Sequence, residues 1–397
     1  MITQTKLHFL TLLIIAFGLV ACDDDSVDVT PTPVEPEPAL NGAIFTQTNQ
    51  DQNAVVFYER ADDGRLSLVG TYATGGSGTN INEPDAPGFN DPLGSQGAVA
   101  ISPDRAFVFA VNAGDNTVTS FRIFPDRLER VSTVSTGGVT PISVAATNDY
   151  LYVVNNGDGG SAQGFDLADD GTLTALNNSN LNFGRGGDPL GAAAISVSPD
   201  GDHVVVTTKP DSKLLVLDTD NGRLTEFTEI ESTGMTPFGS QFIDDNTLLV
   251  SEAFGGDSLA GAISSYDLDN NQVRTVSSSV PTNQTASCWV VTSPSGRYAY
   301  TSNTPAGTIT TFRLDSNSGA LTTTTNSGVS GTVPNPEGSF VLDMATTEGE
   351  FLYVVVNTNS QIVPFQIDGI NLNLIADGVI TDTNLLPEGR VTGLAGF

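Results

Sequence analysis

Two ionisable residues in the middle of the chain have the types and the placement that acid–base chemistry needs. Lys209 and Glu252 each follow a run of apolar residues, at matching places in neighbouring sequence repeats. Opposite charges at such places predict either a structural ion pair or an acid/base beside an electrophile. Arg185, in a Gly-Arg-Gly-Gly run, could clamp a carboxylate through its guanidinium. Lys209 and Glu252 are therefore the candidate catalytic residues, and Arg185 is a candidate substrate-binding residue.

Asparagine stands at the corresponding place in four other repeats. These residues are Asn112, Asn155, Asn303 and Asn357. Because asparagine caps hairpins and tolerates left-handed backbone, a structural role is the preferred interpretation. The alternative is that they line a ligand site together with Lys209 and Glu252.

Scarce histidine and cysteine narrow the chemistry further. His8 lies in an N-terminal leader. His203 begins a predicted strand, so it should lie on the face opposite to Lys209 and Glu252, whose face is the one expected to bind ligands. A Ser-His-Asp catalytic triad and a His-rich metal site are therefore excluded on the ligand-binding face. Acidic loops such as Asn155–Asp158 match no defined calcium loop, so we interpret them as solvated turns. Cys288, beside Trp289, is interpreted as a small buried hydrophobe.

The N-terminus has the pattern of an export signal. The short apolar run Leu7–Val20 is typical of a secretory signal, and Leu-Val-Ala-Cys at its end resembles a bacterial lipobox. We predict a signal peptide over residues 1–21, a lipid anchor at Cys22, and a Pro-rich acidic tether over residues 22–40. An ordinary signal peptide is the alternative. The prediction places the protein in the cell envelope, at the outer membrane or cell surface rather than the inner membrane.

Composition excludes other partners. The 397 residues include 46 Asp or Glu but only 15 Lys or Arg, which gives a formal net charge of -31. A nucleic-acid binder needs a basic face, so no nucleic-acid partner is expected. Membrane attachment would come through the lipid alone, and 2 cysteines exclude a disulfide scaffold.

A repeat of about fifty residues organises the chain after residue 40. Its most regular marker is a proline, found at Pro92, Pro141, Pro189, Pro237, Pro336 and Pro387. One interval is double, so a copy without the marker is expected, and Thr285–Ser287 stands where it should begin.

Each repeat predicts four antiparallel strands. In one copy these are Gly97–Ser102, Ala106–Asn112, Thr117–Ile123 and Leu128–Thr133, separated by turn residues. Four strands per repeat of this length indicate an all-β fold, a seven-bladed β-propeller over residues 41–397. The first blade lacks an inner strand within its own repeat, because its first predicted strand, Ala43–Gln47, has the pattern of a second strand. We predict that the chain end, Gly389–Phe397, supplies the missing strand and closes the ring.

The longest connection should lie over the face that binds ligands. It runs from Ala73 to Gln96 and is rich in Gly, Asn and Asp. Loops of this length in compact repeats are usually functional.

Several motifs together resemble the seven-bladed lactonase family, which includes 6-phosphogluconolactonase-like and carboxymuconate-cyclase-like proteins. They are the Ser198–Gly201 turn of Ser-Pro-Asp-Gly, the Val-Asn strand ends and the Asp-Gly-x-Leu hairpins. The resemblance spans residues 41–397. It implies opening or forming of a lactone on a small carboxylated substrate, without a cofactor.

The site residues that this resemblance implies are mostly replaced. The family's histidine before the Ser-Pro-Asp turn corresponds to Ala193, and an arginine corresponds to Lys213. A Gly-Pro-Arg-His run corresponds to Thr236–Gly239, which has lost both the cation and the imidazole. Lys213 joins Arg185 as a candidate substrate-binding residue.

Two hypotheses follow. The first is a divergent lactone hydrolase or cyclase that acts on a small carboxylated or sugar-acid substrate. The second is a non-catalytic propeller that binds a glycan, peptide or protein at the cell surface. A monomer is expected in either case, and neither hypothesis includes a cofactor or a metal.

Overall fold

The computed structural model describes residues 40–79, 91–185, 189–269 and 272–397. All of them belong to one compact unit, Ala39–Phe397. The predicted signal peptide, the lipid anchor at Cys22 and nearly all of the tether lie outside the described residues. None of the helices in the described ranges has the length and apolar character needed to cross a bilayer.

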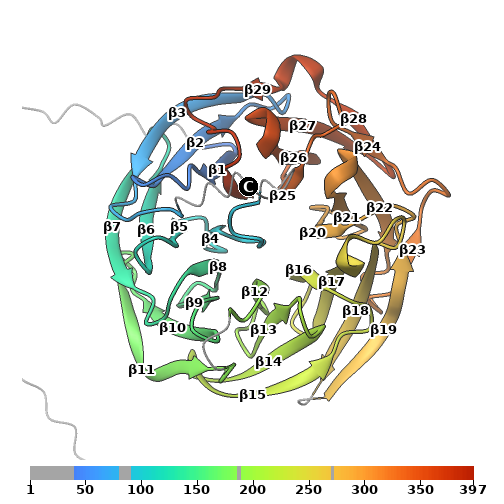
Figure 1. Ribbon diagram of the computed structural model, residues 1–397. Helices are drawn as coiled ribbons and strands as arrows, with labels where there is room; N and C mark the ends of the chain where they lie inside the picture. The colour runs from blue at the N-terminus through green and yellow to red at the C-terminus, as the bar shows by residue number, and fades with distance from the viewer. Residues whose placement is uncertain (1–39, 80–90, 186–188, 270–271) are drawn as a thin grey trace, which may run out of the picture. The chain divides into compact units, whose positions relative to one another are not determined.

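Seven antiparallel sheets stand around a common centre, as Figure 1 shows. From the centre outward, blade 1 contains β30 (Thr392–Gly396), β1 (Ala43–Gln47), β2 (Ala54–Arg60) and β3 (Leu66–Ala73). Blade 2 contains β4 (Val99–Ile101), β5 (Phe107–Asn112), β6 (Thr117–Phe124) and β7 (Arg127–Ser135). Blade 3 contains β8 (Pro141–Ala146), β9 (Tyr150–Asn155), β10 (Ser161–Leu167) and β11 (Leu173–Asn182).

The remaining blades repeat this order. Blade 4 contains β12 (Ala192–Val197), β13 (His203–Thr208), β14 (Lys213–Asp220) and β15 (Arg223–Glu231). Blade 5 contains β16 (Pro237–Phe242), β17 (Thr247–Glu252), β18 (Ala262–Asp269) and β19 (Gln272–Pro281). Blade 6 contains β20 (Ser287–Thr292), β21 (Tyr298–Asn303), β22 (Thr308–Leu314) and β23 (Leu321–Thr323), with β24 (Gly331–Thr332) also on β22. Blade 7 contains β25 (Val341–Thr347), β26 (Phe351–Val356), β27 (Gln361–Asp368) and β28 (Asn371–Leu374), with β29 (Ile380–Thr381) also on β27.

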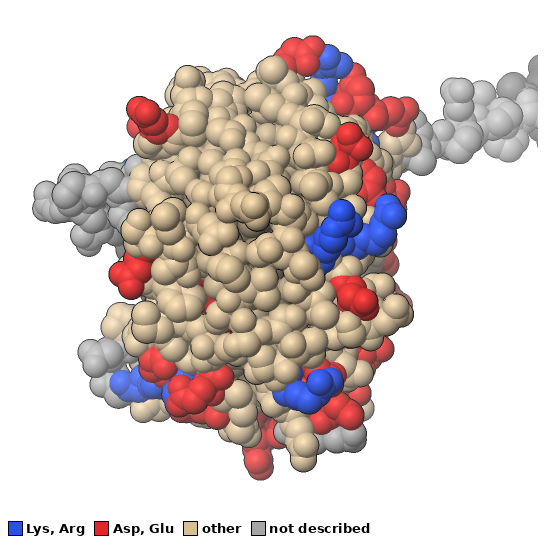
Figure 2. All heavy atoms as spheres, turned by 90° about the vertical axis from the view of Figure 1, so that its right-hand side faces the viewer, with Lys and Arg blue, Asp and Glu red and all other residues tan. Residues whose placement is uncertain are grey.

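Burial explains which sequence runs form which strands. The second strands, such as β5 and β26, are buried at every position because a blade covers each face. Such strands read as continuous apolar runs rather than alternating ones. Outer strands such as β7 are mostly exposed or half-buried, with Leu128 as the one buried residue of β7. Acidic side chains are scattered over the surface that Figure 2 shows, with cations in small groups among them.

The copy without a proline marker is blade 6. Its inner strand begins at Ser287, whereas β8 and β16 begin at Pro141 and Pro237. The residue before each start has the same left-handed backbone, with φ of 56° at Thr140, 55° at Thr236 and 52° at Ala286. The turn is therefore kept where the proline is lost, and seven blades are confirmed.

The chain end completes blade 1, as predicted. β30 pairs with β1 along Ile44–Gln47, and Ala43 and Phe397 exchange backbone hydrogen bonds of 3.1 Å each. The Thr46 hydroxyl donates to the Gly393 carbonyl at 2.6 Å. The ring is thus closed by two strands from opposite ends of the described chain.

Truncation after Pro387 should therefore destabilise the whole propeller. It removes β30 and the buried side chains of Val391, Leu394 and Phe397, each of which stabilises the fold by roughly 1.5–3 kcal/mol. The expected loss of several kcal/mol is comparable with the total stability of a typical domain, about 5–15 kcal/mol. Thermal unfolding followed by circular dichroism measures it, and equal melting of the two chains would refute the closure.

A point substitution tests the same contact without deletion. Gly393 has φ +76°, and a Cβ there would lie 2.7 Å from the Val99 backbone nitrogen. Gly296 has a similar φ, +66°, with nothing within 4 Å of its Cβ position. We expect Gly393→Ala to unfold with about 1–3 kcal/mol less free energy than the control Gly296→Ala.

Candidate functional site

Residues 91–97, the bridging segment, connect four blades at the centre of the ring. Figure 1 shows this segment beside β4 near the middle. Its polar groups bond to the inner ends of blades 3 to 6: Ser95 Oγ to Ile142 O (2.8 Å), Gln96 N to Ala193 O (2.8 Å), Gln96 Nε2 to Ser240 O (3.0 Å), and Val290 N to Gln96 Oε1 (2.9 Å). The described end of the predicted long loop therefore lies across the face expected to bind ligands.

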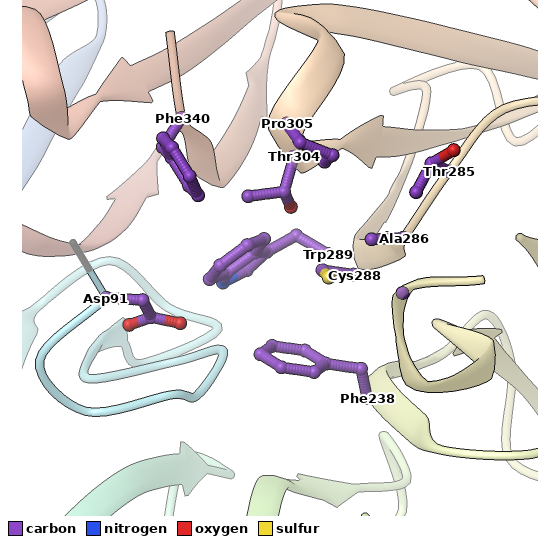
Figure 3. A pocket seen from close by; sticks show the side chains of 10 residues that line it. Asp91, Phe238, Thr285, Ala286, Cys288, Trp289, Thr304, Pro305 and Phe340 are labelled. Carbon is purple, nitrogen blue, oxygen red and sulfur yellow. The ribbon is translucent and has the colours of Figure 1, made fainter. Parts of the chain in front are cut away.

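A pocket of about 210 Å³ opens between the bridging segment and blades 5 to 7. Figure 3 shows the side chains around it, with the Asp91 carboxylate facing the rings of Phe238 and Trp289. The rest of its wall comes from strand starts and loops on the same face: Gly256, Thr285, Ala286, Cys288, Thr304, Pro305 and Phe340. Three aromatic rings and one carboxylate thus surround the space.

Asp91 is the acid of this pocket. Its Oδ1 accepts a hydrogen bond from the Gly94 backbone N–H at 2.9 Å, while its buried Oδ2 has no protein partner. Burial raises the pKa of Asp91 to about 6, against the opposing effect of the Lys209 charge. A carboxylate in a pocket wall with a pKa of about 6 can act as a general base.

Lys209 is the cation beside it. Its Nζ donates to the Gly94 carbonyl at 2.5 Å and lies 5.0 Å from the centre of the Phe238 ring, within cation–π range. Burial lowers the pKa of Lys209, while the nearby Asp91 charge opposes that shift. Asp91 therefore lines the pocket, whereas Lys209 contacts its wall through Phe238 and Gly94 and acts on Asp91 through its charge.

Trp289 and Cys288, on the inner strand β20 of blade 6, line the pocket. Trp289 is the only tryptophan of the chain; its Nε1 donates to the Ser95 carbonyl at 3.1 Å, and its ring centre lies 4.9 Å from that of Phe238. Cys288 is buried and in no disulfide, and burial raises its pKa to about 12. A neutral, buried thiol agrees with the predicted hydrophobic role.

A second acid, Asp343 of β25, lies in a separate cavity. This cavity of about 230 Å³ is lined by inner-strand residues together with Gln96 and Gln241. Asp343 is only 2% exposed, and burial, reinforced by the Asp91 charge, raises its pKa well above the usual range. Burial thus disfavours the charged form of Asp343.

Glu252 has partners different from those of Lys209. It is fully buried, and its carboxylate accepts hydrogen bonds from Gly234 N (2.9 Å), Ser264 Oγ (2.5 Å) and Ser279 Oγ (2.7 Å). These donors lie in blade 5 and the loop that leads into it. Burial raises the pKa of Glu252, and the three hydrogen bonds oppose that shift.

Strand register explains this difference. Glu252 pairs with the first residue of its inner strand, as do Asn155 and Asn303. In blade 4 the residue in that position is Thr208, so Lys209 stands one residue later. Because side chains alternate across a strand, a one-residue offset turns the side chain to the other face. Asn357 has the same offset, since Val356 is the paired residue in blade 7.

The four asparagines are buried and bonded mainly inside their blades. Asn112 Nδ2 donates to Thr117 and Thr119, and Asn303 Nδ2 donates to Thr308 and Thr310, all at 2.9–3.1 Å. Asn155 Nδ2 donates to the Thr136 carbonyl and to Ser161 Oγ. Asn357 begins the short helix η3 (Asn357–Asn359) and is 1% exposed. These contacts fit the structural interpretation.

The remaining predicted cations are paired with acids. Arg185 lies 2.6 Å from an Asp211 oxygen and 3.1 Å from a Glu229 oxygen. Lys213 contacts Glu231 on the next strand, which raises its pKa. A substrate carboxylate would have to displace these partners.

Three positions at which the family resemblance implied site residues have other residues in this chain, and these residues contact the bridging segment or line the pocket. Phe238, where the family has arginine, lines the pocket. At Gly239 an added Cβ would lie 2.1 Å from Gln96 Oε1, so glycine leaves room for that side chain. The carbonyl of Ala193 accepts the Gln96 N–H.

Sequence reasoning did not select Asp91 or Trp289 as site residues. Asp91 was visible only as part of the repeat marker, where the blades 3 and 5 have Thr140 and Thr236. Because Asp188 is an acid at the same position of another copy, the residue type at the marker does not by itself single out Asp91. Within the described residues, no group of three or more His, Cys, Asp or Glu side chains could hold a metal ion.

Comparison with known families identifies the class of protein. The sequence model described as "Lactonase, 7-bladed beta-propeller" matches residues 52–181 and 258–376, more than half of the chain. The chain therefore belongs to the lactonase family of seven-bladed propellers. Comparison with curated proteins gave no match.

Solved structures share the fold at low sequence identity. The periplasmic gluconolactonase PpgL of Pseudomonas aeruginosa is 18% identical, with a TM-score of 0.64 over 89% of this chain and 98% of its own. A candidate 6-phosphogluconolactonase from Bacteroides fragilis is 16% identical, with a TM-score of 0.63 over 91% of this chain and all of its own. At these identities the likeness concerns the fold.

Loss of the Glu252 carboxylate should destabilise blade 5. In Glu252→Ala the hydroxyls of Ser264 and Ser279 and the Gly234 N–H lose their acceptor, and each unpaired buried group costs about 1–3 kcal/mol. We expect a total loss of at least about 3 kcal/mol in the free energy of unfolding, measured in urea. The control Glu226→Ala changes an exposed acid and should shift it by less than about 0.5 kcal/mol. Equal stability of both variants would contradict the structural role.

Proposed function

We propose that this protein hydrolyses a lactone in the pocket beside Asp91. The observation that carries the proposal is Asp91, an acid with a raised pKa in the wall of an aromatic pocket, with the Lys209 cation against the Phe238 ring of the same wall. Membership of the lactonase family supports a cyclic ester as the substrate. The proposal gives the base role to Asp91 and leaves Lys209 as the electrostatic group.

The chemistry needs one water molecule and these two side chains. The free Oδ2 of Asp91 removes a proton from water, and the hydroxide formed attacks the lactone carbonyl carbon. The Lys209 ammonium stabilises the negative charge on the carbonyl oxygen in the transition state. The ring C–O bond then breaks, the leaving oxygen takes the proton from Asp91, and a hydroxy acid results. The reverse sequence forms a lactone, so a cyclase uses the same groups.

The cellular placement is also a proposal. The pattern of residues 1–21 and Cys22 supports export and lipid attachment in the cell envelope. The similar Pseudomonas protein is described as periplasmic, which agrees with export. Binding of a surface glycan, peptide or protein without catalysis is the alternative function, supported by the replaced family residues at Phe238 and Gly239.

The rate of lactone hydrolysis should depend on the ionisation of Asp91. The base is active when ionised, so kcat/KM should rise about tenfold per pH unit below pH 6 and level off above it. At alkaline pH it should fall as Lys209 loses its proton. Asp91→Asn should lower kcat by roughly 10²–10⁴-fold, measured against spontaneous hydrolysis of the same lactone.

Two further variants separate the candidate residues. Lys209→Met keeps the side-chain length but removes the charge, and should also reduce kcat. Glu252→Gln keeps most of the buried contacts and should leave the pH profile unchanged. If Glu252→Gln abolishes turnover while Asp91→Asn does not, the base is Glu252. If no lactone is hydrolysed by the unmodified protein, the non-catalytic alternative stands.

A further inference from the structure

The described walls of the Asp91 pocket contain one ionisable acid, whose charge the nearby Lys209 cation opposes. Asp91 is its only acidic lining residue among those described, and the Lys209 charge, from outside the lining, lowers the pKa of that acid. Cys288 is neutral because its pKa is about 12. An anionic substrate would face the Asp91 carboxylate, and a cationic one would compete with Lys209 for the same carboxylate and the Phe238 ring. Charge therefore favours a neutral ligand.

The polar groups of the wall are few. The lining side chains are mainly rings and small apolar groups: Phe238, Trp289, Phe340, Ala286 and Pro305. The Trp289 N–H already donates to Ser95, and the Thr285 hydroxyl accepts the Leu259 N–H at 3.0 Å. Thr304 is the other lining residue with an uncharged polar side chain among those described. A ligand with many hydroxyl groups would bury several of them without partners, which is costly.

The size of the pocket restricts the ligand as well. Its volume is about 210 Å³. An apolar cavity of roughly 150 Å³ takes up benzene, whereas drug-sized ligands occupy roughly 300 Å³ or more. The pocket therefore accommodates one small ring with a short substituent.

From these walls we infer that the substrate is an uncharged lactone with a short apolar substituent, rather than a phosphorylated or polyhydroxylated sugar lactone. This inference rests on the proposed function and names the substrate class of the same site. The substituent packs between the Phe238, Trp289 and Phe340 rings, and the lactone carbonyl lies toward Asp91 and Lys209.

The fluorescence of Trp289 allows the inference to be tested by ligand binding, without an assay of catalysis. It is the only tryptophan in the chain and is part of the wall, so its fluorescence reports on this pocket. The full chain is titrated with δ-valerolactone, δ-hexalactone and δ-octalactone, and separately with δ-gluconolactone. Each added methylene should tighten binding about fourfold until the pocket is filled. δ-Gluconolactone should give no saturable change over the same concentrations.

Variants show whether the signal comes from this pocket. Thr285→Phe places a ring at the wall and should weaken δ-octalactone binding at least tenfold. Met235→Ala is the matched control, because Met235 is exposed on the same face and does not line the pocket. Its binding constant should equal that of the unmodified protein. Circular dichroism confirms that both variants are folded.

Hydrolysis of the same lactones separates this inference from the proposed function. Higher kcat/KM for δ-octalactone than for δ-gluconolactone supports both. Efficient hydrolysis of δ-gluconolactone, with tighter binding than the alkyl lactones, overturns the substrate class and leaves lactone hydrolysis intact. Saturable binding of alkyl lactones without any turnover supports the apolar ligand class and overturns the catalytic function. Affinity that does not change along the alkyl series overturns the inference.

Discussion

Hydrogen bonding between the bridging segment and the inner ends of the blades is the constraint on which the candidate site depends. The side-chain amide of Gln96 bonds to Ser240 in blade 5 and to Val290 in blade 6, and its backbone bonds to blade 4. These bonds fix the backbone that carries Asp91 and hold it over the pocket. The open space at Gly239 makes the crossing possible, since any side chain there would collide with Gln96.

Desolvation shifts the pKa values of Asp91 and Lys209. In water Asp91 and Lys209 would both be fully ionised at neutral pH and strongly hydrated. In the structure burial moves the pKa of Asp91 up and that of Lys209 down, so the two groups approach the range where proton transfer is possible. Glu252 is also buried, but three donors hold its carboxylate inside blade 5. Hydrogen bonding, more than burial, separates an available acid from a structural one.

The fold was predictable because its signals are local, whereas the site depends on distant contacts. Turn residues, apolar runs and the repeat length lie within about fifty residues, and they predicted seven blades and closure by the chain end. Lys209 and Glu252 have different partners because a one-residue register offset follows from strand pairing, which the sequence pattern does not specify. The Ser95–Trp289 and Gln96–Val290 bonds join residues 194 positions apart, and no motif marks them.

The chain can keep the family's fold while its site residues differ, because the contacts that maintain the fold are not those that form the site. Backbone ladders and ring closure maintain the propeller, and they tolerate side-chain change at the inner ends of the strands. The resemblance implied a cation and an imidazole at positions 238 and 239, but this chain has a ring and a glycine there. Phe238 makes the pocket apolar, and Gly239 admits Gln96, which helps to place Asp91 at the pocket. The same two replacements therefore remove one set of charged groups and make room for another, so the loss of the family residues does not by itself argue against catalysis.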